Sequence, residues 1–295
     1  MRPQIRRALV AGWFSFANNK ATYGDVACKD VVCSWLADLN IPTDVGGNPE
    51  NGVDGIDVCT ADPHKYDIFI FVCGPWFPHW VLDRFSSCLK IGVNLSVPVS
   101  GNNGFDVLFY RDSPAGANPD LALVSKSTCT KKPFIGVALV HQQPMFGERQ
   151  RHERVRSVVH EYLREYKLPW VQVDTLLTNN ETSTNTVEQF EAVLKRVDVL
   201  VSSRLHGLVF AIKNNVPVVA IDAIAGGAKV TAQTQALNWP HLLDGDTCQV
   251  EDIARHVDMC MNGETQKVIA RALTTARERL DDLRKEFDRT IRCRL

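Results

Sequence analysis

Arg204 and His206 lie two residues apart in VDVLVSSRLHGLVFAIKNNVPVVAID, the stretch 197–222. Its pattern predicts a strand that ends at Ser203 and a helix that begins immediately afterwards. The free amide groups and positive dipole end of a helix start attract anions. Arg204 would add a planar cation for a phosphate or carboxylate, with Ser203 beside it, and His206 a group that exchanges protons near neutral pH. The alternative is that Arg204 pairs with a nearby acid and His206 only packs against the sheet.

Two further residues lie where predicted strands end. His141 follows the apolar run 133–140, so it is a candidate second catalytic histidine, the alternative being a structural loop residue. Arg111 and Asp112 end another predicted strand. Arg111 is a candidate substrate-binding residue, and a local ion pair with Asp112 is the competing interpretation.

Several familiar cofactor and metal motifs are absent from the sequence. No Gly-x-Gly-x-x-Gly follows a strand, no Gly-Lys-Ser/Thr loop occurs, and no His-Glu-x-x-His or Cys-x-x-Cys set is present. We therefore expect no metal and no resident cofactor. The nine cysteines are odd in number and several lie in apolar runs, which favours reduced thiols and a cytoplasmic location.

The bulk composition indicates a globular chain of two domains. The 295 residues are 45% hydrophobic and 23% charged, enough for two cores. The net charge of −1 gives no sign of nucleic-acid binding. No run approaches the roughly 18 apolar residues that would span a membrane. A homo-oligomer is compatible with these numbers.

Short apolar runs alternate with amphipathic segments along the chain. Strands are predicted at 8–16, 66–74, 89–97, 105–112, 121–124, 133–140, 169–175, 197–203 and 216–222. Helices are predicted at 26–39, with Asp25 as its cap, and at 151–166, 187–195 and 205–214. This alternation predicts an α/β fold of two Rossmann-like domains facing a cleft, over 1–127 and 128–264. Residues 265–295 form an amphipathic helix that we expect to pack back on the first domain.

The order of several motifs resembles the polysaccharide pyruvyltransferases over about residues 8–240. The specific motif is the corner Ser203-Arg204-Leu205-His206-Gly207, with Val216-Pro217 opening the next strand. The remaining parts are less specific singly but occur in the family's order: Gly12, Asn18, Gly24, Asp25, Gly74, Arg111-Asp112, Pro119-Asp120-Leu121 and Lys229-Val230.

The resemblance implies a fold like the B-type glycosyltransferases, phosphoenolpyruvate as donor and a hydroxyl pair of a saccharide as acceptor. It leaves open whether that acceptor is lipid-linked. Arg204 would hold the donor, His206 would bind it or transfer a proton, and Lys229 would add charge to the same pocket. Asn18 and Asp25 would bind substrate on the acceptor side, in the first domain. The chain departs from the family in having His141 where relatives often have Arg, and only Gly74-Pro75 as its middle turn.

Two other functions share this pattern. A glycosyltransferase that uses a sugar nucleotide would need an acid for the donor ribose, for which Asp222 and Glu188 are candidates. A non-catalytic relative that binds an anionic ligand is the third interpretation.

Overall fold

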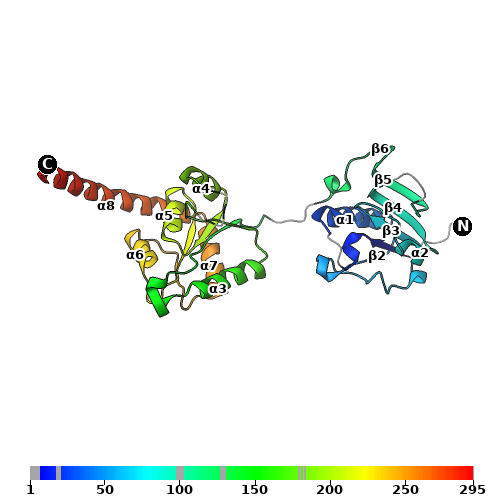
Figure 1. Ribbon diagram of the computed structural model, residues 1–295, viewed down its shortest axis with the longest axis horizontal. Helices are drawn as coiled ribbons and strands as arrows, with labels where there is room; N and C mark the ends of the chain where they lie inside the picture. The colour runs from blue at the N-terminus through cyan, green and yellow to red at the C-terminus, as the bar shows by residue number, and fades with distance from the viewer. Residues whose placement is uncertain are drawn as a thin grey trace. The chain divides into compact units, whose positions relative to one another are not determined.

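The computed structural model describes residues 7–17, 21–97, 103–126, 131–178, 180, 182 and 184–294. Contacts divide the chain into two compact units, one up to Thr128 and one from Cys129. Each unit is built on a largely parallel sheet with helices against it (Figure 1). The predicted α/β fold with two parallel-sheet units is confirmed, and the cleft between them stays a prediction.

The first unit is a six-stranded sheet in the order β2-β1-β3-β4-β5-β6. Neighbouring strands are parallel except for the last pair, in which β6 runs antiparallel to β5. The strands are β1 Ala8–Ala11, β2 Thr43–Val45, β3 Ile68–Val72, β4 Leu89–Ser96, β5 Val107–Ser113 and β6 Gly116–Ala117. The α-helices among the described residues of this unit are α1 Tyr23–Asp38 and α2 Val81–Arg84.

Alternate residues of the central strands face opposite sides of this sheet, because side chains of a strand alternate. Val10 and Ile70 pack with Val32 and Leu36 of α1. Leu9, Phe69 and their neighbours pack on the other face, with α2. The unit therefore has a core on each face of its sheet.

The second unit is a five-stranded parallel sheet in the order β11-β10-β9-β7-β8. Its strands are β7 Ile135–Ala138, β8 Trp170–Gln172, β9 Val199–Ser202, β10 Val218–Asp222 and β11 Leu242–Asp244. Its helices are α3 His152–Glu165, α4 Val187–Leu194, α5 Leu205–Lys213, α6 Lys229–Ala236, α7 Val250–Met261 and α8 Thr265–Arg294. Helices α3 and α7 cover one face, and α4, α5 and α6 cover the other (Figure 1).

The C-terminal helix α8 begins as part of the second unit's core. Ile269 and Ala272 are buried there, next to α5. Further along, the apolar stripe Leu280, Leu283, Phe287 and Ile291 is exposed. Packing of this stripe on the first unit stays a prediction. Within the described residues, no helix has the length and apolar character needed to cross a bilayer.

Three sequence-based predictions in the first unit are wrong. The strand predicted at 8–16 ends at Ala11, and Trp13–Ser15 form a 3-10 helix. Residues 121–124 form the 3-10 helix Leu121–Val124 rather than a strand, because the Asp120 side chain accepts the amide of Ala122 and starts a turn. Helix α1 begins at Tyr23 rather than Val26. Its cap is Thr22, whose hydroxyl accepts from the Asp25 amide while the Asp25 carboxylate accepts from Thr22.

Candidate active site

The corner predicted at 203–207 lies between the carboxyl end of β9 and the start of α5. The buried Ser202 hydroxyl bonds the carbonyl of Ala138 at the end of β7 and accepts from the amide of Arg204. Gly207 follows one turn later, where an added Cβ would lie 2.2 Å from Ser202 Oγ. Glycine is therefore required here for α5 to begin so close to the strand.

Arg204 is held by two neighbouring strand ends. Its Nε donates to the carbonyl of Leu139, just beyond β7, at 3.1 Å. Its Nη2 lies 3.1 Å from Oδ1 of Asp174, which follows β8. The side chains are only 12% and 4% exposed, so this is a buried ion pair. This ion pair is the one predicted by the sequence-based alternative, in which Arg204 pairs with a nearby acid.

His206, by contrast, is exposed on the first turn of α5. It lines a pocket of about 200 Å³ together with Asp174, Thr184, Thr186, Phe190 and Phe210. Asp174 thus belongs both to the pocket and to the ion pair that fixes Arg204. The arrangement places a titratable imidazole over a buried charged pair, at the edge where open parallel sheets bind ligands.

Asp174 was missed by the sequence analysis. Its only signal was an acid near the carboxyl end of the predicted strand 169–175, which pairs with the strand leading to His141. The order of strands in the sheet is what brings it to Arg204, and that order is not written in the local pattern.

The other predicted residues of the second unit lie along the same edge of the sheet. The buried Ser203 Oγ accepts from the amide of Val140, so this hydroxyl has a structural bond. His141 is exposed and accepts through Nδ1 from Arg156 of α3, because a guanidinium can only donate. Lys229 is exposed at the first position of α6. Their roles toward substrate stay predictions.

Asp222, at the end of β10, organises the loop that leads to α6. Its carboxylate accepts from the amides of Ile224, Ala228 and Thr231 and from the hydroxyl of Thr231. The side chain is buried. These four bonds use the acceptor positions of a carboxylate, so Asp222 acts as a loop and helix anchor.

In the first unit, predicted residues meet at a second pocket of about 500 Å³, lined by Trp13, Thr22, Asp25, Gly74, Phe77, Arg111 and Asp120 among others. Gly74 has a φ of +81° and lies against the indole ring of Trp13. A Cβ at this position would lie 2.5 Å from that ring. Asp25 and Arg111, predicted separately, therefore border one cavity. Asn18 lies outside the described residues.

Arg111 is tied to two carboxylates at this pocket. Its Nε donates to Asp112 at 3.0 Å and its Nη1 to Asp120 at 2.9 Å. A hydrogen bond from Ser96, helped by Arg111, lowers the pKa of Asp112. Burial would raise the pKa of Asp120, but bonds from Ala122 and Arg111 lower it overall. Both acids therefore stay ionised at neutral pH and offset the charge of Arg111.

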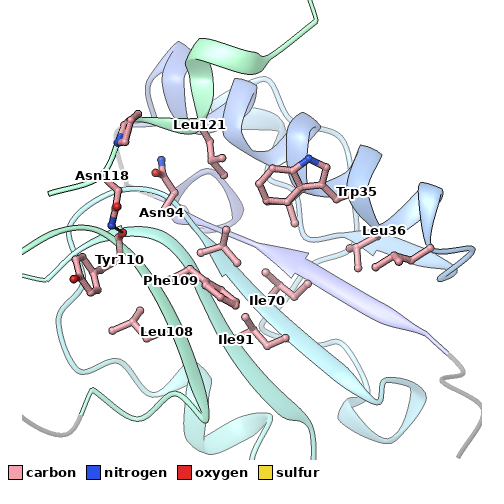
Figure 2. A pocket seen from close by; sticks show the side chains of 14 residues that line it. Trp35, Leu36, Ile70, Ile91, Asn94, Leu108, Phe109, Tyr110, Asn118 and Leu121 are labelled. Atoms are coloured by element: carbon pink, nitrogen blue, oxygen red, sulfur yellow. Dashed lines mark hydrogen bonds between the residues drawn. The ribbon is translucent and has the colours of Figure 1, made fainter. Parts of the chain in front are cut away.

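A third cavity, about 650 Å³, lies on the α1 side of the first sheet (Figure 2). Trp35 and Leu36 of α1 face Ile70, Ile91 and Phe109 of the strands across it. Its lining is almost wholly apolar, with the amides of Asn94 and Asn118 at one end. It offers no cation for an anionic donor.

Residues 127–223 match the polysaccharide pyruvyl transferase family. This segment contains β7, β8, β9 and the corner with Arg204 and His206, so the family resemblance is confirmed for this part of the chain and stays a prediction for the residues before it. The family is one of transferases. A comparison with proteins of curated function gives no match.

Solved structures with some likeness include the UDP-GlcNAc 2-epimerase of Methanocaldococcus jannaschii, at 10% identity and TM-score 0.32, covering 90% of this chain and 99% of that one. The glycosyltransferase of kitacinnamycin has 10% identity and TM-score 0.35, covering 96% and 99%. The glycosyltransferase SnogD of Streptomyces nogalater has 12% identity and TM-score 0.33, covering 93% and 98%.

Proposed function

Starting from the match of residues 127–223 to the polysaccharide pyruvyl transferases, we propose that this chain transfers the pyruvyl group of phosphoenolpyruvate to two hydroxyls of a saccharide, forming a ketal. The observation that carries the proposal is the exposed His206 beside the buried Arg204–Asp174 pair, at the start of α5 within the matched segment. No metal or resident cofactor enters the scheme.

The donor is assigned to the second unit because cations gather at the carboxyl edge of its sheet. Arg204, Lys229 and Arg156 lie there with His141, while the nearby acids Asp174 and Asp222 are buried in bonds of their own. Phosphoenolpyruvate carries a carboxylate and a phosphate, which such an edge attracts. The amide groups at the start of α5 add to this attraction.

The chemistry needs one proton delivered and two hydroxyl protons removed. A proton reaches the methylene carbon of phosphoenolpyruvate while one acceptor hydroxyl attacks the central carbon and loses its own proton. The second hydroxyl then attacks the same carbon, the bond to phosphate breaks, and its proton leaves with the phosphate. We assign this proton delivery to His206, because an imidazole can act as a general acid and His206 is exposed on the first turn of α5. Arg204 would orient the donor.

The saccharide is assigned to the pocket of the first unit. Among the described residues lining it, Asp25 and Asp120 are acids and Arg111 is a cation already paired with carboxylates. That balance disfavours an anion and suits a neutral polyol, whose hydroxyls can donate to carboxylates. Trp13 and Phe77 supply apolar ring surface beside these polar groups, as ligand pockets commonly do.

The sugar-nucleotide alternative loses one of its two acids. Asp222 is buried, and its carboxylate already anchors the loop and the start of α6 through four hydrogen bonds, so it is not presented to a ribose. Glu188 on the first turn of α4 is exposed and remains the acid for that hypothesis.

The test is calorimetric binding of phosphoenolpyruvate and of a uridine diphosphate sugar to the wild type, Arg204→Lys and Arg196→Lys. Lysine keeps the charge beside Asp174 but cannot reproduce the planar fork. We expect Arg204→Lys to weaken phosphoenolpyruvate binding by roughly 10-fold or more, since charge-assisted bonds contribute about 1.5–3 kcal/mol. Arg196, exposed before the amino end of β9, is the matched control and should bind as the wild type does.

Binding of the sugar nucleotide but not of phosphoenolpyruvate would overturn the donor assignment. Equal binding of phosphoenolpyruvate by all three proteins would remove Arg204 from the donor site.

A further inference from the structure

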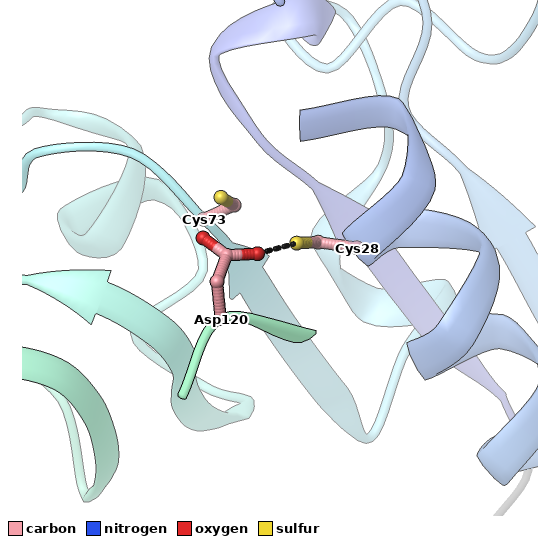
Figure 3. A group of neighbouring side chains, drawn as sticks. All are labelled: Cys28, Cys73 and Asp120. Atoms are coloured by element: carbon pink, nitrogen blue, oxygen red, sulfur yellow. Dashed lines mark hydrogen bonds between the residues drawn. The ribbon is translucent and has the colours of Figure 1, made fainter. Parts of the chain in front are cut away.

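Three side chains from separate segments of the first unit converge beside its polar pocket. Cys28 lies on α1, Cys73 directly follows β3, and Asp120 precedes the 3-10 helix Leu121–Val124 (Figure 3). Their sulfur atoms and one carboxylate oxygen all lie within 4.8 Å of one another. The two cysteines are buried, and Asp120 is partly buried.

These thiols differ from an ordinary core cysteine of the same unit. Buried Cys88 turns its Sγ to the backbone carbonyls of Tyr66 and Pro63. The Sγ atoms of Cys28 and Cys73 instead accept hydrogen bonds from Nδ2 of Asn94, at 3.5 and 3.9 Å. An N–H donor shared by two sulfur atoms favours negative charge at the pair. The Cys28 thiol lowers the pKa of Cys73, whereas Cys73, burial and Asp120 raise the pKa of Cys28.

The backbone at this cluster is held in an uncommon conformation. Cys73 has a φ of +61° and Asn94, on the neighbouring strand, a φ of +57°. Asparagine adopts left-handed backbone readily, whereas at Cys73 this conformation is strained, and such strain is concentrated at functional sites. The Cys73 sulfur lies within 4.8 Å of the Cys28 sulfur and of a carboxylate oxygen of Asp120; Figure 3 shows the three side chains.

The two oxygens of Asp120 face different partners. Oδ1 accepts from the Cys28 thiol at 3.4 Å and from the Ala122 amide at 2.8 Å, and Oδ2 accepts from Arg111 at 2.9 Å. A carboxylate with one oxygen at a ligand set and the other fixed by a donor matches the way outer residues orient metal ligands. Arg111, which Asp112 also holds, would then position the ligand.

We propose that Cys28 Sγ, Cys73 Sγ and Asp120 Oδ1 bind one Zn²⁺ ion, with a fourth coordination position open toward the pocket that Cys73 and Asp120 line. Two thiolates and one carboxylate are a donor set that zinc accepts in tetrahedral geometry. Bond lengths of about 2.0–2.3 Å place tetrahedral ligand atoms about 3.3–3.8 Å apart, close to the 3.4 Å between Cys28 and Asp120.

Zinc binding displaces the thiol protons, which pass to solvent, so affinity falls as pH is lowered. The sequence-based expectation of no metal rested on missing local motifs, and this set comes from three separated segments. The site does not depend on the proposed pyruvyl transfer.

The test measures the metal itself. The full chain, freed of metal and fully reduced, is titrated with Zn²⁺ against a chromophoric chelator and separately with Co²⁺. We expect one Zn²⁺ per chain and, with Co²⁺, the intense absorption of tetrahedral cobalt bound to thiolate. Cys28→Ser, Cys73→Ser and Asp120→Asn should each weaken Zn²⁺ by more than the roughly 10- to 100-fold typical for an outer partner, and Asn94→Ala by about that amount.

Two cysteines outside the cluster are matched controls. Cys33→Ser on α1 and Cys88→Ser in the core should bind Zn²⁺ as the wild type does. If either serine variant of the cluster fails to fold by circular dichroism, Asp120→Asn decides the outcome. The proposal is overturned by a wild type that binds no Zn²⁺, by equal binding in the cluster variants, or by a Cys28–Cys73 disulfide in the protein as isolated.

Discussion

At the scale of single residues, the candidate site depends on the buried ion pair between Arg204 and Asp174. Arg204 and Asp174 are each almost fully covered, so removal of either would leave the other buried and charged without its ion-pair partner. Breaking a buried pair in this way costs about 3–5 kcal/mol. A loss of function in Arg204→Ala would therefore mix binding with stability, and for that reason Arg204→Lys is the better probe.

His206 offers the opposite case, because it is exposed and fills no hole in the core. We expect His206→Ala to keep its melting temperature, since surface changes are usually within about 0.5 kcal/mol. Its turnover should fall about 10²- to 10⁴-fold if the imidazole transfers a proton. Parallel measurement of thermal unfolding and phosphate release from phosphoenolpyruvate checks both.

Two histidines serve as comparisons for His206. His64→Ala, on the surface of the first unit, should change neither quantity. His141→Ala asks whether the residue bonded to Arg156 takes part. A full rate of pyruvyl transfer in both His206→Ala and His141→Ala would show that the site assignment is wrong.

The sequence indicated Arg204 and His206 because these two polar residues lie directly after a predicted buried strand, at the start of an apolar helix. It could not indicate Asp174, which reaches Arg204 only because β8 and β9 flank β7. Nor could it indicate the group of Cys28, Cys73 and Asp120, which α1, β3 and a 3-10 turn bring together. Contacts across strands depend on the order of the sheet, and local spacing does not encode that order.

At the scale of elements, the position of α5 depends on Gly207. An added methyl group would lie 2.2 Å from Ser202 Oγ and 3.1 Å from its Cβ, so either the Ser202 side chain would have to rotate and lose its hydrogen bonds or helix and strand would have to separate. We expect Gly207→Ala to lower the free energy of unfolding by about 1–3 kcal/mol, as overpacking does. Denaturant unfolding monitored by circular dichroism measures the change.

The control for this prediction is Gly263→Ala, between α7 and α8. A Cβ there meets nothing within 4 Å, so its stability should equal that of the wild type or exceed it slightly. A Gly207→Ala protein as stable as Gly263→Ala would contradict this prediction, because it would show that the start of α5 accommodates a methyl group at no cost in stability.

Predicted elements were most accurate where strands are buried on both faces. The runs at 133–140, 197–203 and 216–222 contain β7, β9 and β10, whose residues are buried throughout. The run at 121–124 is apolar too, yet Leu123 is 78% exposed, so an apolar pattern was mistaken for a buried strand. Over so few residues, the hydrogen bond that the Asp120 carboxylate accepts from the Ala122 amide outweighed strand propensity.

At the scale of the whole molecule, buried histidines make the second unit sensitive to acid. Burial lowers the pKa of His152, His241 and His256 below the ordinary value of about 6.5. Both ring nitrogens of His152 lack a hydrogen-bond partner among the described residues. Unfolding exposes these rings, and below about pH 6.5 the unfolded chain binds more protons than the folded one.

Stability should therefore be complete above about pH 6.5 and fall as the pH drops below it. We expect the melting temperature to decrease between pH 7.5 and pH 5.5, and His152→Leu to reduce that decrease. The exposed His64→Leu should leave it unchanged. Thermal unfolding at three pH values checks this, and a pH slope identical in all three proteins would contradict it.

The left-handed backbone of Cys73 has a consequence for how this position tolerates change. Glycine adopts such a conformation freely, whereas an L side chain costs roughly 1–2 kcal/mol. In a library of variants selected only for folding, glycine should therefore be enriched at position 73. In a library selected for what the sulfur does, cysteine should persist. The ratio of the two residues under the two selections would separate the requirements of the fold from those of the function at a single codon.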